Sequence, residues 1–94
     1  GPLPPQAKML FLVHRLRQRA LRLGIRRLEI GSAAGVVEFD RDHRVEPERV
    51  VRLIQRPGSR YRLDGPNRLR LRLAAADASS RIVAAGEVLD DLDG

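Results

Sequence analysis

The chain has 94 residues with no cysteine or tryptophan, which limits it to one small domain and excludes disulfides and thiolate metal sites. Hydrophobic residues make up 43% of it, but no apolar stretch is long enough to span a bilayer and no signal-peptide pattern opens the chain. These features fit a cytoplasmic domain without a membrane role. The net charge of +6 leaves three uses open: binding nucleic acid, binding another protein, or partial neutralisation by the acidic residues 74–94.

The first predicted element is a helix over residues 5–23. Pro5 suits the first helical position, and Gly24 suits the left-handed residue that follows a helix. Between them, apolar residues recur every three or four positions, as they do on one face of a helix. The expected buried face comprises Met9, Leu12, Val13, Leu16, Ala20 and Leu23, with Leu10 and Leu21 widening it.

A β-hairpin is predicted over residues 26–39, because apolar and polar residues alternate on both sides of the five-residue connection Gly31–Gly35. A charged loop follows the hairpin, and Pro47 then starts a short helix over residues 47–55. The apolar side of this second helix comprises Val50, Val51, Leu53 and Ile54.

A second hairpin is predicted over residues 60–73 with its turn at 64–67, and a last helix over residues 78–92, capped by Asp77 or Ser79. The buried stripe of this helix comprises Ile82, Ala85, Leu89 and Leu92. The strand residues expected to point into the core are Leu28, Ile30, Val37, Phe39, Leu63, Leu69, Leu71 and Leu73. The order α-β-β-α-β-β-α therefore predicts a single α+β domain over residues 1–94, with a mainly antiparallel four-stranded sheet packed with helices.

No set of residues in the sequence predicts catalysis. His14, on the polar flank of the first helix, and His43, in the charged loop, are expected to be solvated surface histidines. Metal binding needs His, Cys or carboxylate side chains clustered at ligand spacing, and no such cluster is found. Glu87, Asp90 and Asp91, on the polar face of the last helix, are expected to be solvated carboxylates. We therefore expect a non-enzymatic domain without a cofactor.

Arginines that alternate along the second hairpin form the first candidate site. The residues expected on one face of the sheet are Arg60, Arg62, Arg68, Arg70 and Arg72. Such a plate of guanidinium groups could neutralise several phosphates. The alternative is an ordinary antiparallel sheet with one solvated face, where alternate residues are polar. Tyr61 is expected on the opposite face, so no platform for stacking bases is predicted.

The first helix carries the second candidate site. Its polar side gathers the basic residues Lys8, Arg15, Arg19 and Arg22. Phe11 falls among them, where an exposed aromatic ring would anchor a protein interface. The alternative is that Leu3 and the neighbouring prolines fold over this ring. Arg17 interrupts the apolar face and needs either an edge position or a carboxylate partner. Both oddities favour a protein partner.

Three segments of the sequence resemble a known family. They are residues 23–29 (Leu-Gly-Ile-Arg-Arg-Leu-Glu), 35–39 (Gly-Val-Val-Glu-Phe) and above all 61–69 (Tyr-Arg-Leu-Asp-Gly-Pro-Asn-Arg-Leu). Together they are similar to the C-terminal domain of bacterial transcription-repair coupling factors, and the resemblance covers essentially the whole chain. In that family a charged helical segment ending in Arg-Phe-Gly precedes this stretch and supplies part of the docking surface. No docking residue of the family is therefore transferred to this chain.

The resemblance implies a parent that is an ATP-driven translocase on double-stranded DNA, which displaces stalled RNA polymerase and recruits excision repair through UvrA. ATP and Mg²⁺ would belong to its motor domains, which this sequence does not contain. The C-terminal domain is implied to be an autoinhibitory clamp that docks on the UvrB-like N-terminal module and covers the surface that binds UvrA. Two function classes stay open: this regulatory interaction domain, and a free-standing basic nucleic-acid-binding module.

Overall fold

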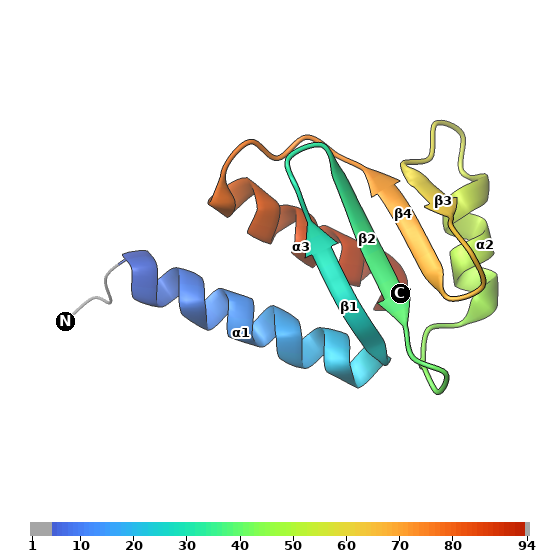
Figure 1. Ribbon diagram of the computed structural model, residues 1–94, viewed down its shortest axis with the longest axis horizontal. Coiled ribbons are helices and arrows are strands. Elements are labelled where there is room, and N and C mark those ends of the chain that lie inside the picture. Colours follow the sequence, from blue (N-terminus) through green and yellow to red (C-terminus); the bar gives the residue numbers. More distant parts are fainter. Residues whose placement is uncertain (1–4, 94) are drawn as a thin grey trace.

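The computed structural model describes residues 5–93 and has the predicted order of elements in an α+β fold (Figure 1). The helices are α1 (Pro5–Leu23), α2 (Pro47–Gln55) and α3 (Ala78–Asp93), and the strands are β1 (Ile25–Ile30), β2 (Ala34–Phe39), β3 (Tyr61–Leu63) and β4 (Arg68–Arg72). Proline opens both α1 and α2, because its fixed φ suits the first turn and its missing N–H is not needed there.

The four strands form one antiparallel sheet in the order β1-β2-β4-β3, which confirms the predicted sheet. β2 lies inside the sheet, where Val37 is opposite Leu28 of β1 on one side and Leu69 of β4 on the other. β3 completes the far edge by pairing Leu63 with Leu69. The pairing of β2 with β4 therefore joins the two hairpins.

The connection of the first hairpin is shorter than predicted. Ala34 and Gly35 belong to β2, so the loop comprises three residues, 31–33, instead of five. Gly35 lies between Ile30 and Leu71 on the neighbouring strands, and a Cβ atom there would approach the Glu29 carbonyl oxygen to 3.0 Å. A glycine that the pattern assigned to a loop is therefore needed for close packing inside the sheet.

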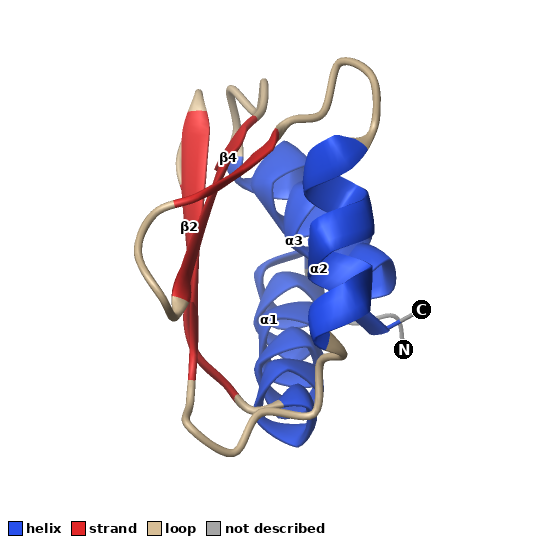
Figure 2. Ribbon diagram, turned by 90° about the vertical axis from the view of Figure 1, so that its right-hand side faces the viewer, coloured by secondary structure: helices blue, strands red, loops and turns tan. Residues whose placement is uncertain are grey.

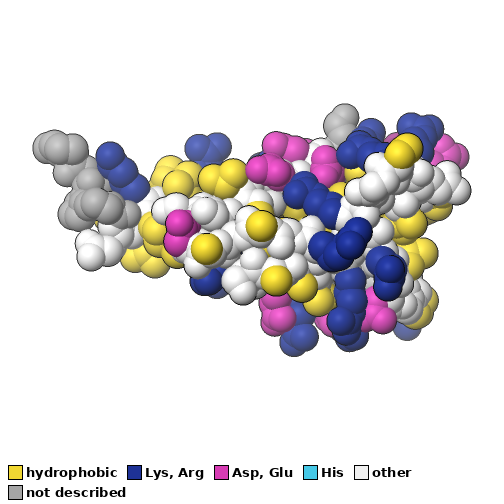
Figure 3. Space-filling model, turned by 90° about the horizontal axis from the view of Figure 1, so that it is seen from above, with side chains coloured by type: hydrophobic (Ala, Val, Ile, Leu, Met, Phe, Trp, Pro, Cys, Tyr) yellow, Lys and Arg dark blue, Asp and Glu magenta, His cyan; other side chains and the backbone are white. Residues whose placement is uncertain are grey.

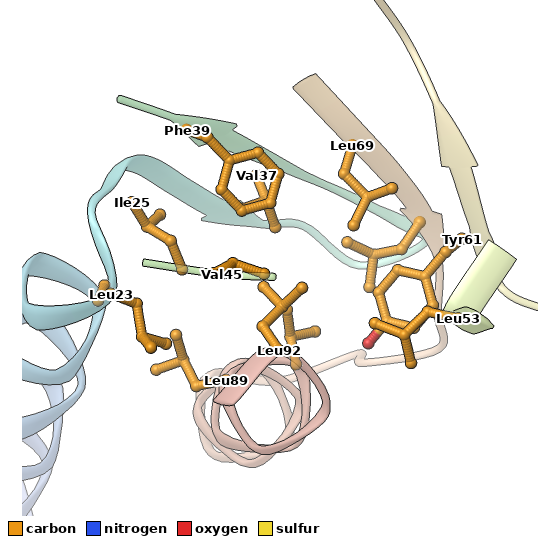
Figure 4. Close-up of a cluster of buried hydrophobic side chains, with 13 residues drawn as sticks. Leu23, Ile25, Val37, Phe39, Val45, Leu53, Tyr61, Leu69, Leu89 and Leu92 are labelled. Atoms are coloured by element: carbon orange, nitrogen blue, oxygen red, sulfur yellow. The ribbon is translucent and has the colours of Figure 1, made fainter. Parts of the chain in front are cut away.

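All three helices cover the same face of the sheet, as Figure 2 shows with the sheet seen nearly edge-on. Side chains from both layers meet in one core (Figure 4). Val37 and Leu69 of the sheet and Leu89 of α3 have no exposed surface, and Tyr61 is 5% exposed. Among residues 5–93, no helix covers the opposite face of the sheet, and most of its side chains are polar.

Most strand residues predicted to face the core do so, but Leu63 does not belong to it. Phe39 and Leu71 are buried, whereas Leu28, Ile30 and Leu73 are partly buried and pack against the core. Leu63 is 54% exposed although it pairs with the buried Leu69. Because β3 is a three-residue edge strand, Leu63 has a neighbouring strand on one side only.

The predicted apolar faces of α1 and α2 are also too wide. Leu10, Leu12 and Leu21 of α1 are exposed, and so is Val51 of α2. Figure 1 shows the reason for α1: its N-terminal half runs away from the sheet, and only its C-terminal end lies against β1. The buried side chains of α1 are accordingly Ala20 and Leu23, near that end.

α3 begins as its cap predicts, and its buried residues lie between Ala84 and Leu92. The Asp77 carboxylate accepts a hydrogen bond from the backbone N–H of Ser80 at 2.7 Å, so Asp77 is the cap. This hydrogen bond lowers the pKa of Asp77 below its ordinary value. Of the predicted stripe, Ala85, Leu89 and Leu92 are buried and Ile82 is partly buried.

The turn from α1 into β1 depends on Gly24. Its φ of +80° is the left-handed conformation that glycine adopts readily, and a Cβ atom there would lie 2.5 Å from the His43 Cα. His43 is half-buried, with its ring centroid 5.1 Å from that of Phe39 and its Nδ1 buried without a hydrogen-bond partner. The prediction that His43 is solvated is therefore wrong, whereas His14 is exposed as expected.

Candidate interaction surfaces

The first candidate surface is the helix-free side of the sheet. Because Leu69 and Leu71 point into the core, strand alternation places their neighbours on β4 on the opposite side. Arg62 of β3 joins them there, since it lies directly opposite Arg70. We call this surface the arginine face, and it comprises Arg62, Arg68, Arg70 and Arg72.

Glu38 of β2 neutralises one end of the arginine face. Its carboxylate lies 2.8 Å from Arg68 Nη2, 3.4 Å from Arg26 Nη2 and 3.8 Å from Arg27 Nη1, and its side chain is only 6% exposed. Removal from water raises the pKa of Glu38, but the hydrogen bond from Arg68, the charge of Arg27 and the hydrogen bond from Arg26 lower it more. Its pKa is therefore below the ordinary value, and ionised Glu38 gathers three guanidinium groups.

Asp64 neutralises the next arginine along β4. Its carboxylate accepts a hydrogen bond from Arg70 Nε at 2.6 Å and lies 3.6 Å from Arg68 Nη1. The hydrogen bond from Arg70 lowers the pKa of Asp64. Arg62 and Arg72 are exposed and have no carboxylate at ion-pair distance within the part of the chain that the structure describes. These two arginines are the cations of the face that are left for an external partner.

Arg60 does not belong to the arginine face, so its predicted place there is wrong. Its guanidinium lies 3.3 Å from Asp91 Oδ2 and 3.6 Å from Glu87 Oε2, both on α3. The Tyr61 hydroxyl donates a hydrogen bond to the same Asp91 oxygen, and removal from water together with this ionised partner raises the pKa of Tyr61. Arg60 precedes β3, where the alternation of a strand has not yet begun, and it can therefore turn toward α3.

Glu87 and Asp90 of α3 are exposed as predicted, but they also form ion pairs, and Asp91 is only 24% exposed, which corrects the prediction for Asp91. Besides Glu87 and Asp91, Asp90 lies 2.6 Å from Arg19 Nη2, and Asp93 lies 3.6 Å from the same atom. Arg19 thereby ties the C-terminal half of α1 to the end of α3. Figure 3 shows basic and acidic side chains side by side over the half of the molecule away from its N-terminus.

The second candidate surface is the polar side of α1, where Arg19 has acidic partners but its arginine neighbours do not. Phe11 is 57% exposed, and the guanidinium carbon of Arg15 lies 6.0 Å from the centroid of its ring. Arg15 and Arg22 are exposed and have no carboxylate partner among the residues described. The alternative in which Leu3 covers Phe11 concerns a residue outside the described range.

Sequence reasoning missed an apolar hollow of about 300 Å³ between α1, β1 and α3. Its walls include Val13 of α1, Leu28 and Ile30 of β1, and Ile82 of α3. Arg17 also lines it, exposed and without a carboxylate partner in the described part of the chain, so Arg17 occupies an edge position. The feature of the sequence that could have indicated this hollow is the unusual width of the predicted apolar face of α1.

The side chains of both surfaces are cations and apolar groups, which suit binding to anionic or apolar partners.

Within residues 5–93, no group of three His, Cys, Asp or Glu side chains is placed to hold a metal ion. Over the same residues, no helix combines the length and apolar character needed to cross a bilayer.

Comparison with known proteins agrees with the resemblance to transcription-repair coupling factors. The profile of the TRCF domain matches residues 1–50. The chain is 38% identical over 93 residues to the transcription-repair-coupling factor of Escherichia coli strain K12, and 30% identical over 82 residues to that of Haemophilus influenzae. These alignments cover 99% and 87% of this chain but only 8% and 7% of the two relatives. The chain belongs to the family of the transcription-repair-coupling factor (TRCF) domain.

Proposed function

We propose that this chain is the C-terminal regulatory domain of a bacterial transcription-repair coupling factor and acts as an autoinhibitory clamp. It docks on the UvrB-like N-terminal module of its parent and masks the surface that binds UvrA. The observation that carries this proposal is the 38% identity to a transcription-repair-coupling factor over 99% of the chain. In the cytoplasm, the parent would contact RNA polymerase and double-stranded DNA and hold ATP and Mg²⁺ in motor domains outside this chain.

The distribution of charges supports a protein partner. Three of the five arginines expected to bind phosphate, Arg60, Arg68 and Arg70, already pair with carboxylates of the domain. Exposed apolar side chains such as Leu10 and Phe11 suit a protein interface, which needs an apolar or aromatic anchor at its centre. A phosphate backbone offers no partner for such side chains.

One observation favours a second candidate function, nucleic-acid binding on the arginine face. Arg62 and Arg70 are directly opposite each other on neighbouring strands, and like charges in that position destabilise a sheet. Together with Arg72 they line a hollow of about 630 Å³. A phosphate group in this hollow would relieve the repulsion between them and add a charge-assisted hydrogen bond.

A titration separates the two functions. The labelled domain is titrated with the UvrB-like module of its parent at about 0.15 M salt, and UvrA is then added. The clamp proposal predicts binding to the module and loss of that binding when UvrA is present. Absence of binding to the module would refute it.

The second function predicts instead submicromolar binding of duplex DNA under the same conditions. The single variants Arg62→Glu and Arg72→Glu should then each weaken this binding by about tenfold or more. Arg52→Glu is the matched control, because Arg52 is an exposed arginine of α2, away from the arginine face. An equal loss in the control would assign the effect to net charge alone.

A further inference from the structure

Four residues lie along one flank of α1, beside the apolar hollow. Leu10, Val13, Arg17 and Leu21 are separated by three or four positions, so they follow one another along the same side of the helix. Leu10 is 71% exposed and Leu21 is 65% exposed. We call this flank and the hollow beside it the α1 groove.

The opposite wall of the α1 groove is also apolar. Leu28 and Ile30 of β1 and Ile82 of α3 line the hollow, and all three are only partly buried. Figure 1 shows α1 and β1 diverging toward the N-terminal end of α1, where the helix loses contact with the sheet. The surface is thus a trough between a helix on one side and a strand and a second helix on the other.

The charged side chains that line the hollow of the α1 groove are both positive. α1 contains no Asp or Glu, and both Arg17 and Arg81 line the hollow. Within residues 5–93 neither has a carboxylate at ion-pair distance, and Arg81 donates instead to the backbone carbonyls of Ala75 and Ala76. The other side of α1 is different, because Arg19 there pairs with acidic residues of α3.

We propose that the α1 groove binds an acidic amphipathic helix of a partner protein. Apolar side chains of that helix fill the hollow, and its Asp or Glu side chains pair with Arg17 and Arg81. A helix with one apolar side flanked by carboxylates matches both the shape and the charge of the groove. Because the helices and the arginine face lie on opposite sides of the sheet, this assignment does not rest on nucleic-acid binding, and its test below does not need the UvrB-like module.

A second copy of the chain fits the groove less well. Its acidic helix is α3, but Glu87 and Asp91 of α3 are already paired with Arg60, and Asp90 with Arg19. Docking of α3 into the groove of another copy would break these pairs. We therefore assign the carboxylates to a polypeptide segment other than a second copy of this chain.

Two families of synthetic helical peptides test the proposal with the 94-residue chain. Each peptide has about 18 residues with Leu at every third or fourth position, and the two families differ only in carrying Glu or Lys beside the Leu stripe. Fluorescence anisotropy should show binding of the Glu peptides that weakens with salt, and no binding of the Lys peptides. Equal binding of both families, or binding of neither, would overturn the proposal.

Variants locate the binding surface. Leu21→Ser and Arg17→Glu should each lower the affinity for the Glu peptide by about tenfold or more. Val83→Ser and Arg62→Glu are the matched controls, because both residues are exposed and neither lines the α1 groove. All four variants should keep the thermal midpoint of the wild type, since the replaced side chains are exposed.

Two results would reject the site even if a peptide binds. The first is a Glu-peptide affinity that Leu21→Ser and Arg17→Glu leave unchanged. The second is a dimer of the unliganded chain in sedimentation that Leu21→Ser dissociates, because a second copy would then occupy the groove. The proposal predicts a monomer at the concentrations of the titration.

Discussion

The side of the domain around α3 and the exposed side of α1 both contain several arginines and leucines, but these side chains have different surroundings in the two regions. Around α3, Arg60 pairs with Asp91 and Leu89 is fully buried. On the exposed side of α1, Leu10 is exposed and Arg15 has no carboxylate partner among the residues described. The comparison teaches that arginine content does not locate a binding surface. A binding surface is located instead by cations and apolar side chains that have no partner among the described residues of the domain.

The largest difference between the two regions should appear in stability. Phe39 is 6% exposed, so Phe39→Ala should lower the free energy of unfolding by about 3–5 kcal/mol. Leu10→Ala, at an exposed position of α1, should change it by less than about 0.5 kcal/mol. Urea denaturation followed by circular dichroism measures both. A loss under about 1 kcal/mol for Phe39→Ala would show that the core is misplaced.

Two carboxylates of α3 should differ, by a smaller amount, in their contribution to the free energy of unfolding. Asp91 is 24% exposed and accepts hydrogen bonds from Tyr61 and Arg60, so Asp91→Asn should cost about 1–3 kcal/mol. Asp90 is 70% exposed, and Asp90→Asn should cost at most about 1 kcal/mol through loss of its pair with Arg19. Equal losses in the same denaturation assay would contradict the distinction between a network and a surface pair.

Acid should weaken the ion pairs of the arginine face. The pKa of Glu38 is lowered in the folded state, so its ionised form stabilises the fold above its unfolded pKa of about 4.3. That contribution is lost as the pH falls through the lower folded pKa. Glu38→Gln should therefore lose less stability than the wild type on acidification below about pH 4. Urea midpoints measured over this range check the prediction, and parallel curves for the two proteins would refute it.

The smallest effect is expected at the exposed ring of α1. Phe11→Ser should change the free energy of unfolding by less than about 0.5 kcal/mol, because the ring is 57% exposed. Thermal denaturation measures this change in stability, and Leu12→Ser, at a second exposed position of α1, is the comparison variant. A loss above about 1 kcal/mol confined to Phe11→Ser would mean that the ring is covered in solution, as the alternative involving Leu3 requires.

The sequence contained the elements of the fold but not their arrangement. The sequence predicted helix ends well where a residue type has a specific preference there, as Pro5 has at the start of α1 and Gly24 just after its end. They failed at Gly35, since a glycine between apolar residues indicates a turn unless a close contact from another strand requires it. The pairing of β2 with β4 was not predictable in detail either, because alternation specifies the faces of a strand and not its neighbours.

The candidate surfaces were predicted less well than the fold, for a related reason. Alternation grouped Arg60 with Arg62, but Arg60 lies outside β3 and its partner Asp91 is far away in the chain. Ion pairs of this kind depend on the packing of α3 against the sheet, which local patterns do not encode. The hollow beside Val13 is likewise formed by three separate elements, so no single segment could reveal it.

The most direct test of the central claim, that this domain contacts proteins rather than nucleic acid, is a duplex DNA titration over about 0.05–0.2 M salt. With Arg62 and Arg72 as the unpaired cations of the arginine face, the account predicts weak, sequence-independent binding of roughly 10⁻⁴ to 10⁻⁶ M near physiological salt. The slope of log K against log salt should be no steeper than about −2, as for two phosphate contacts. Submicromolar binding with a slope of about −4 or steeper would contradict the account and make the arginine face a nucleic-acid site.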